Sequence, residues 1–299
     1  MLNIGRILHQ DRLLRATTGL NRRAFETLLE KFEQVYLAEA DNREKPRKRK
    51  IGAGRKARLQ SIREKLFYIL FYLKCYPTFD LAAVLFDFDR SQANRWVHRL
   101  QPILEKVLGE KKVLPLRKIE RLEEFIQHFP EVKEVIVEGT FIPIARPKDA
   151  EKQKENYSGK KKRCTRKNLA ASAEDKRILV LTPTTSGKTH DKKIQEQEDL
   201  IGGIPAQIPV LVDSGFQGVQ KQYVNIRLPH KKPKGGELTA EQKQENRELA
   251  KERVVGENAF SGVKRYRAVS DIYRNRVANF DDQLILTACG LWNFYLAAA

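Results

Sequence analysis

The hydrophobic positions in the first third of the chain follow helical spacing. Apolar side chains recur every three or four residues from Asn21 to Ala40, and again from Ser61 to the proline at position 77. Pro77 to Phe86 is typical of a short capped helix, and Asp87 to Asp89 of a tight turn. This pattern predicts an all-α region at the start of the chain.

A second helix is predicted directly after that turn, from Arg90 to Leu100, with Ser91 as its N-cap. Two helices joined by a three-residue turn form a helix-turn-helix, although any two helices with a short connection share the pattern. We expect Ala93, Trp96, Val97 and Leu100 to pack inward. The side chains available to bases or phosphates are Arg90, Gln92, Asn94, Arg95, His98 and Arg99. DNA binding is the favoured interpretation, and a purely structural helical domain is the alternative.

Beyond a helical stretch at 122–129, the pattern changes to short apolar runs typical of strands. Val135 to Thr140 is one strand, which residues 141–145 either continue or pair with as a hairpin. The other predicted elements are a hairpin with arms at 165–173 and 177–183, a helix at 190–200 and a strand at 210–212. Strands alternating with helices indicate an α/β sheet covered on both faces.

A long helix is predicted to begin at the capping box of Thr239 and Gln242 and to run to about Arg267. Its apolar face comprises Leu249, Gly256, Ala259, Phe260 and Val263. Gly256 and Gly262 each weaken the helix by about 1 kcal/mol relative to alanine. Either they mark close approach of another group, or they have no structural role.

Composition adds a strong positive charge to this picture. The chain has 299 residues, a net charge of +19 and a pI near 9.8, so it is expected to bind a polyanion. Nucleic acid is preferred over an anionic membrane, since no apolar run approaches the roughly 20 residues that span a bilayer. The segment from Arg43 to Arg58 holds nine Lys and Arg against one Glu, and is either a DNA-binding arm or a solvated linker.

Cysteine and histidine do not form a metal-binding or disulfide pattern. The three cysteines are widely separated, as are the five histidines. This spacing favours a reducing cytoplasm. For a DNA-binding protein, association with the nucleoid is expected. Any metal is therefore expected to be held by carboxylates.

Three carboxylates on separate predicted elements are candidates for that role. Glu138 and Asp213 each end a strand, and Glu257 lies on the long helix. The plain alternatives are a turn-forming Asp213 and an ion pair between Glu257 and Arg253. Oxygen ligands suit Mg²⁺ or Mn²⁺. Two such ions stabilise both the attacking and the leaving oxygen in phosphoryl transfer.

The chain resembles bacterial insertion-sequence transposases of the Asp-Asp-Glu superfamily, in particular the insertion-sequence-5 type, from about Thr18 to Leu296. The motifs that carry the resemblance are Tyr76–Asp80, Arg90–Val97, Arg146–Asp149, Tyr157–Lys162, His190–Lys193, Asp213–Gly218, Leu228–Pro233, Glu257–Asn258, Gly262–Arg267 and Tyr273–Arg276.

This resemblance implies an α/β, ribonuclease-H-like catalytic domain at 116–299, preceded by an all-α helix-turn-helix domain at 1–115. It implies metal-dependent cleavage and strand transfer on double-stranded DNA, at the element ends and the target, by a homo-oligomer. Glu138, Asp213 and Glu257 match the family's three catalytic, metal-binding acids in order. The further DNA contacts expected are Lys160, Lys161, Lys162, Arg163, Lys264, Arg265 and Arg267.

The first acid departs from the family pattern. The family has Asp-Gly-Thr followed by an acidic or polar residue, whereas this chain has Glu138-Gly139-Thr140-Phe141. One extra methylene displaces the carboxylate by more than the roughly 0.5 Å that catalytic arrangements tolerate. Two hypotheses follow: an active transposase, or a catalytically impaired relic that acts only as a DNA-binding protein.

Overall fold

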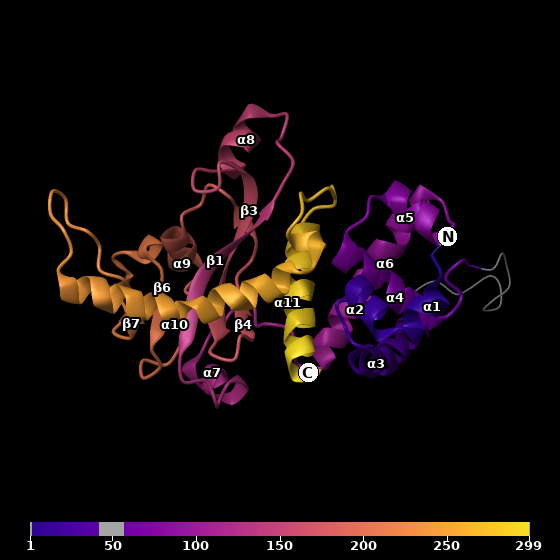
Figure 1. Ribbon diagram of the computed structural model, residues 1–299, viewed down its shortest axis with the longest axis horizontal. Helices are drawn as coiled ribbons and strands as arrows, with labels where there is room; N and C mark the ends of the chain where they lie inside the picture. The colour runs from indigo at the N-terminus through magenta and orange to yellow at the C-terminus, as the bar shows by residue number, and fades with distance from the viewer. Residues whose placement is uncertain (1, 42–56, 299) are drawn as a thin grey trace. The chain divides into compact units, whose positions relative to one another are not determined.

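The computed structural model describes residues 2–41 and 57–298 (Figure 1). The chain divides into two compact units. The first comprises Met1–Leu114, Arg265–Ala268 and Asn293–Ala299, and the second comprises Pro115–Lys264 and Val269–Trp292. Of the basic stretch predicted from Arg43 to Arg58, only the last two residues are described. Within the described residues, no helix is long and apolar enough to cross a membrane.

The first unit is built from helices. They are α1 (Ile4–His9), α2 (Asp11–Thr18), α3 (Arg22–Asp41), α4 (Ile62–Cys75), α5 (Phe79–Phe86) and α6 (Arg90–Glu110). A capping box of Ser61 and Glu64 begins α4, and the Thr78 hydroxyl caps α5. Asp87 adopts a left-handed conformation (φ 55°), which ends α5 and turns the chain toward α6. The predicted helix, turn and helix are confirmed.

The start of α6 differs from the prediction. Its N-cap is Asp89, whose side chain makes no capping hydrogen bond, so Ser91 lies inside the helix. The helix continues through Pro102 to Glu110, well beyond the predicted end. Pro102 is tolerated despite its missing N–H because packing holds the helix together on both sides of it: Leu100, Ile103 and Leu104 are all buried.

The second unit holds a mixed sheet with helices around it. Its strands are β1 (Val135–Pro143), β2 (Tyr157–Ser158), β3 (Arg163–Ala173), β4 (Ile178–Leu181), β5 (Thr185–Ser186), β6 (Val210–Val212) and β7 (Ile226–Arg227). Its α-helices are α7 (Leu122–His128), α8 (Ala150–Asn156), α9 (Asp191–Glu198) and α10 (Ala240–Lys264), together with most of α11 (Phe280–Ala298). Three single 3-10 turns complete the secondary structure: η1 (Ser214–Phe216), η2 (Val219–Lys221) and η3 (Arg267–Val269).

The strand order is β2-β3-β1-β6-β7, with β4 and β5 also paired to β3. β1 runs antiparallel to β3 and parallel to β6, which in turn is parallel to β7. β1 is one continuous strand through Pro143, so the alternative of a separate hairpin partner at 141–145 is wrong. The predicted β3–β4 hairpin is confirmed, and the expected fold class holds: a mixed sheet with flanking helices after an all-α region.

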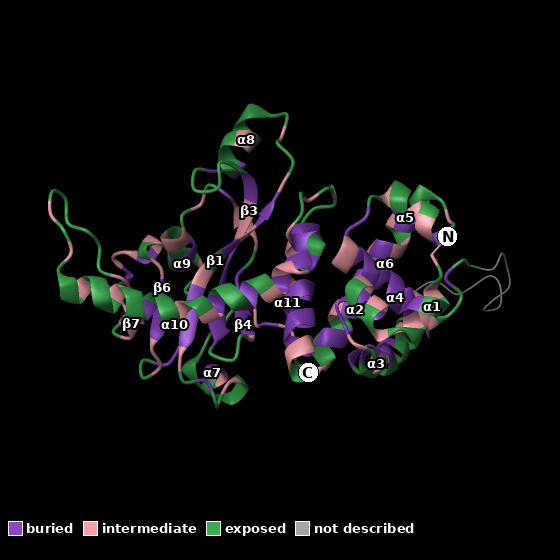
Figure 2. Cartoon of the chain, viewed as in Figure 1, coloured by how far each residue is buried: buried purple, intermediate pink, exposed green. Residues whose placement is uncertain are grey.

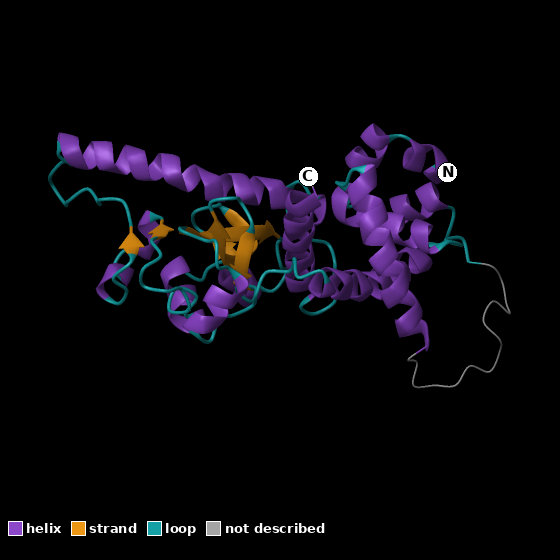
Figure 3. Cartoon of the chain, turned by 90° about the horizontal axis from the view of Figure 1, so that it is seen from below, coloured by secondary structure: helices purple, strands orange, loops and turns teal. Residues whose placement is uncertain are grey.

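Successive side chains along β1 and β6 point to opposite faces of the sheet, and each face packs against different helices. Val135 and Val137 of β1 and Val210 and Val212 of β6 share a core with Phe125 of α7 and Ile194 of α9. Ile136 and Leu211 point to the opposite face, where they pack against Leu249 of α10. Figure 2 shows the central strands largely buried, and Figure 3 shows the long α10 helix on one side of the sheet.

The predicted capping box and apolar face of α10 are both confirmed. Thr239 and Gln242 exchange their hydrogen bonds, and the five predicted apolar positions are the buried ones. The helix ends at Lys264, three residues earlier than predicted. Both of its glycines mark close approach. A Cβ at Gly256 would lie 2.8 Å from Ile136 Cγ2, and one at Gly262 would lie 2.5 Å from the Trp292 ring.

We predict that Gly256→Ala destabilises the protein. Alanine favours the helix by about 1 kcal/mol, but forcing its methyl group against buried Ile136 costs about 1–3 kcal/mol. The net loss, on the order of 1 kcal/mol, is measured as the free energy of unfolding in denaturant. Val254→Ala on the exposed side of α10 is the control and should change stability by less than about 0.5 kcal/mol. A Gly256→Ala protein as stable as the wild type would contradict the close approach.

Candidate active site

The three predicted acids line one cavity in the second unit. The cavity has a volume of about 270 Å³, and Glu138 of β1, Asp213 after β6 and Glu257 of α10 all contribute to its wall. Its other lining residues are Gly139, Thr140, Phe141, Lys160, Lys161, Asp191, Arg253, Phe260, Ser261 and Lys264. Carboxylates 119 positions apart along the chain therefore meet at one place.

The register of the sheet accounts for this meeting. β6 pairs with β1 only from Val135 to Val137, opposite Val210 to Val212. The residue after this paired stretch is an acid in both strands. Asp213 follows the end of β6, whereas Glu138 lies inside β1, which continues to Pro143, so the strand end expected at Glu138 is wrong. The two acids are neighbours at the point where the parallel pairing ends. Glu138 follows Ile136 by two positions and so faces α10. A Cβ at Gly256 would lie 3.3 Å from Glu138 Oε1, which places this carboxylate one residue from Glu257 on the helix.

Glu138 is the most perturbed acid in the cavity. Burial, and then the nearby negative charges of Glu257 and Asp213, raise its pKa to about 7, against the opposing effect of Arg253 and Lys264. Its Oε1 atom is buried and accepts no hydrogen bond from the described residues. With its pKa near 7, the Glu138 carboxyl group is only partly ionised at neutral pH, and a bound cation would favour its ionised form.

The Asp213 carboxylate, unlike Glu138 Oε1, has polar partners for both of its oxygens. Its Oδ1 accepts a hydrogen bond of 2.7 Å from the Gly215 backbone N–H, which begins η1. Its Oδ2 lies 3.5 Å from the Lys160 ammonium, and the side chain is 21% exposed. The turn-forming role considered for Asp213 is therefore real, and it fixes the carboxylate at the cavity wall.

A fourth carboxylate, Asp191, lines the same cavity and was not predicted as a site residue. A Cβ at Gly139 would lie 2.7 Å from Asp191 Oδ1, and one at Gly215 would lie 3.5 Å from Oδ2. The ammonium of Lys167 is 3.1 Å from Oδ1. Asp191 is the first residue of α9, in a motif noted only for its resemblance. In the sequence, Asp191 was indicated only by the glycines that it approaches: Gly139, one residue after Glu138, and Gly215, two residues after Asp213.

The described residues include no group of three or more His, Cys, Asp or Glu arranged to hold a metal ion. The donor chemistry nevertheless fits a hard divalent cation, because the acids offer only oxygen and Glu138 Oε1 is a buried acceptor without a donor. Lysine ammonium groups stand beside two of the acids, Lys160 by Asp213 and Lys167 by Asp191. The Arg253–Glu257 pair is not among the ion pairs of the described chain, and Arg253 Nε is buried without a hydrogen-bond partner.

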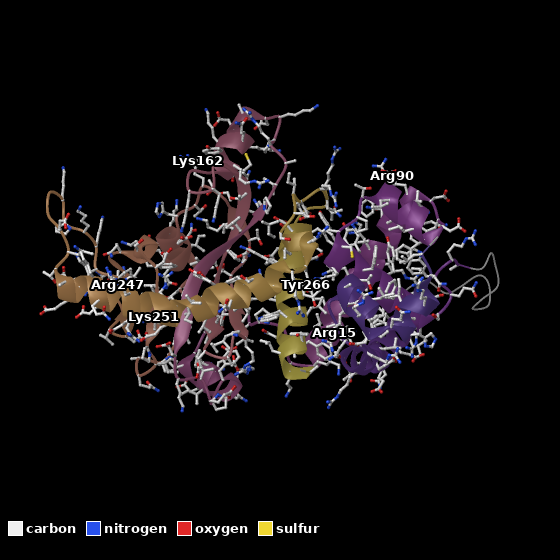
Figure 4. The ribbon with its side chains drawn as sticks, viewed as in Figure 1. Arg15, Arg90, Lys162, Arg247, Lys251 and Tyr266 are labelled. Carbon is white, nitrogen blue, oxygen red and sulfur yellow. The ribbon has the colours of Figure 1, made fainter. Side chains whose placement is uncertain are left out.

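The basic residues predicted to contact DNA separate into three groups. Lys160, Lys161 and Lys264 line the cavity. Lys162 and Arg163 are exposed on and after the turn between β2 and β3, where Figure 4 labels Lys162. Arg265 and Arg267 belong to the first unit. There the Arg265 guanidinium donates to the Gly19 carbonyl and lies 3.8 Å from the Tyr295 ring centroid.

A larger hollow of about 940 Å³ lies on the helix-turn-helix of the first unit. Gln92, Arg95, Trp96 and Arg99 of α6 line it, together with Arg58. Ala93, Val97 and Leu100 are buried as predicted, whereas Trp96 is only half-buried. Arg90, Asn94 and His98 do not line the hollow. Arg90, labelled in Figure 4, is exposed at the start of α6.

Trp96 is held beside cationic groups. The Arg99 guanidinium lies 5.3 Å from the Trp96 ring and 5.5 Å from that of Tyr36, and it donates to the Tyr36 hydroxyl. The Lys65 ammonium lies 5.8 Å from the Trp96 ring and 5.6 Å from the Tyr36 ring. These cation–π contacts fix part of the polar surface of α6.

Comparison with known proteins agrees with this architecture. Residues 137–293 match the family model described as DDE superfamily endonuclease, and residues 57–110 match the helix-turn-helix of DDE superfamily endonuclease. The chain belongs to the DDE superfamily of endonucleases. The first match covers β1 to α11, and the second covers α4 to α6. This member of the superfamily therefore has a helix-turn-helix of the DNA-binding type before its α/β unit in the sequence.

A relative of this DDE endonuclease is similar over nearly its whole length. It is the probable transposase for insertion sequence element IS702 of Microchaete diplosiphon, 27% identical over 286 residues, which cover 96% of this chain and 95% of the relative. No solved structure matches the chain. The predicted resemblance to insertion-sequence transposases of the DDE superfamily is confirmed.

The raised pKa of Glu138 predicts a pH-dependent effect of Glu138→Gln. In the metal-free protein, folding holds the proton on Glu138, so its contribution to stability is full below pH 4.5 and falls as pH rises toward 7. Glutamine does not ionise, so the variant does not lose stability in this way as pH rises. From pH 4 to pH 8 the variant should gain on the order of 3 kcal/mol in free energy of unfolding relative to the wild type.

The measurement is denaturant unfolding with a chelator over this pH range. Glu131→Gln is the control of opposite sign, because hydrogen bonding to Arg177 lowers the pKa of Glu131. Its ionised form stabilises the fold above the unfolded pKa, and that contribution is lost as pH falls. A Glu138→Gln difference that stays constant with pH would contradict the assignment of Glu138 as a proton-holding acid.

Proposed function

We propose that this protein is a DNA transposase that cleaves the ends of its element and joins them to target DNA. The observation that carries the proposal is the convergence of Glu138, Asp213 and Glu257 on one cavity, in the order of the family's three acids. The helical part, residues 1–115, binds the terminal inverted repeats, and residues 116–299 carry out the chemistry. The active complex is a homo-oligomer.

In this proposal Glu138, Asp213 and Glu257 hold two Mg²⁺ or Mn²⁺ ions. Such ions, when bound, stabilise charge on the attacking and leaving oxygens of a phosphodiester. Asp213, fixed by the Gly215 N–H, is the best-positioned ligand, and Glu138 must release its proton to become one. Lys160 leaves Asp213 and turns to the DNA backbone.

The basic residues act by positioning DNA and not by covalent chemistry. Lys160, Lys161 and Lys264 contact phosphates at the cavity, while Lys162 and Arg163 extend this surface along the β2–β3 turn. Arg265 and Arg267 are assigned to phosphate contacts beyond the end of α10. Arg90, Gln92, Asn94, Arg95 and Arg99 read or anchor DNA from α6. Holding both reacting groups in place supplies much of the rate in such reactions.

The second candidate is a DNA-binding protein without useful catalysis. The observation that favours it is the first acid: Glu138 is one methylene longer than aspartate, buried, and protonated near neutral pH. Such a protein would occupy the repeats and compete with active copies. The two functions share the DNA-binding role and differ only in strand cleavage.

Cleavage of DNA carrying the element ends, with Mg²⁺ or Mn²⁺, separates these candidates. We expect the wild type to cut and Glu138→Asp to cut about 10- to 100-fold faster, since the shorter acid restores ligand placement. Asp213→Asn should abolish cutting without loss of DNA binding. Glu248→Gln, on the same helix as Glu257 but outside the cavity, is the matched control and should cut like the wild type.

Each negative outcome of this assay contradicts a different hypothesis. Cutting by Glu138→Asp alone would identify an impaired relic with a correctly located site. Absence of cutting in both proteins, with metal binding unchanged by Asp213→Asn, would overturn the three-acid site.

For the helix-turn-helix, we predict that Arg95→Ala weakens binding to element-end duplex DNA by about tenfold. If Arg95 contacts a phosphate, the slope of log affinity against log salt should fall by about 0.9. Fluorescence anisotropy at several salt concentrations measures both. Arg15→Ala removes the same charge from α2, where Arg15 pairs with Asp11, and should leave the slope unchanged. Equal effects of the two substitutions would mean that only net charge matters.

A further inference from the structure

Phe141 contacts two lysine ammonium groups in the wall of the cavity. Lys161 Nζ lies 4.2 Å from the centre of its ring, and Lys264 Nζ lies 4.3 Å from the same centre. The two nitrogens are therefore no farther apart than these distances together, about 8.5 Å. Both are closer to the ring than the roughly 6 Å within which a cation is attracted to it.

The three side chains come from separate elements. Phe141 lies in β1, three residues after Glu138; Lys161 lies in the turn between β2 and β3; and Lys264 is the last residue of α10. The Lys161 backbone N–H donates to the Ser158 hydroxyl within that turn. Three independent parts of the fold thus place two positive charges on one aromatic ring.

Neither ammonium group forms an ion pair with an acid, although the charge of Glu138 acts on Lys264 from a greater distance. Among the described residues, no carboxylate lies within ion-pair distance of Lys161 or Lys264, although four acids line the same cavity. Lys160 and Lys167, by contrast, each pair with one of those acids. Two neighbouring unpaired cations repel each other, and the negative face of the Phe141 ring offsets part of that repulsion.

We propose that Phe141 is a positioning residue that holds Lys161 and Lys264 together as a clamp for the phosphodiester backbone of DNA. The proposal rests on the proposed transposase function and names the group that organises its phosphate contacts. A span of at most about 8.5 Å suits one phosphate or two successive phosphates of one strand. The clamp lies beside the acids, so the strand it holds is the one presented to Glu138, Asp213 and Glu257.

This role gives the unusual residue after Glu138-Gly139-Thr140 a function. An acidic side chain at position 141 would pair with the lysines and neutralise them. An aromatic ring holds both ammonium groups in place and leaves their charge available to an anion. Phe141 therefore favours phosphate binding at this position.

The test uses the full chain and a double-stranded oligonucleotide, with binding measured by anisotropy over a range of salt. Lys161→Ala and Lys264→Ala should each lower the salt slope by about 0.9. Phe141→Leu should weaken binding about 3- to 10-fold, whereas Phe141→Tyr, which retains the ring, should bind like the wild type. In the Lys161→Ala/Lys264→Ala background, Phe141→Leu should have no further effect.

Replacement of Phe141 by trifluorophenylalanine keeps the shape of the side chain and weakens the negative face of its ring. It should weaken binding as Phe141→Leu does, and thermal unfolding should stay unchanged. This variant decides the matter even where leucine disturbs the fold.

Several results would overturn the clamp. Binding unaffected by fluorination would do so, as would an equal effect of Phe141→Leu in the presence and absence of the two lysines. In either case salt-dependent binding by the wild type would leave the proposed function intact. A wild type that does not bind duplex DNA would overturn both.

Discussion

The close packing of α10 against β1 at Gly256 is the constraint on which the site depends. Because glycine has no side chain, α10 lies closer to Ile136 and Glu138 than it could with any other amino acid at position 256. This approach brings Glu257, the next residue, to the cavity lined by Glu138 of β1 and by Asp213, which follows β6. It also buries Glu138 among like charges, so the geometry that assembles the cavity is the cause of the raised pKa of its first acid.

The charged groups of the cavity are balanced in three different ways. Asp213 and Asp191 each have a lysine at ion-pair distance, whereas Glu138 holds a proton. Lys161 and Lys264 contact an aromatic ring and form no ion pair with an acid among the described residues. A divalent ion and a DNA phosphate would replace these internal arrangements together, because the acids need positive charge and the free lysines need negative charge. Binding of metal and binding of DNA are therefore expected to support each other.

Much of this fold was predictable because its signals are local. The capping box at Thr239, the apolar face of α10 and the strand ending at Asp213 depend on residues adjacent in the sequence. The motifs shared with the family identified the three acids, although their meeting in one cavity depends on the register of β1 with β6. Gly256 was noticed, but its role required knowledge of what lies opposite. Asp191 and the contacts of Phe141 were missed because they arise between elements far apart in the sequence, where periodicity carries no information. Ser91 was misplaced as an N-cap because its side chain suits that position, whereas the preceding left-handed Asp87 already sets the start of the helix.

Three separate segments of the chain form the first unit, and this affects the order in which the protein can fold. Asn293 donates to the Val113 carbonyl, Phe294 lies beneath the Lys111 ammonium, and Tyr295 stacks with Arg265, all within the unit that carries the helix-turn-helix. These residues are synthesised well after residues 1–114 of the same unit. The DNA-binding unit therefore cannot complete its packing early in synthesis, as an ordinary N-terminal domain does. A chain cut short near its end would lose part of the unit at its beginning, so truncated copies would be poor competitors for DNA.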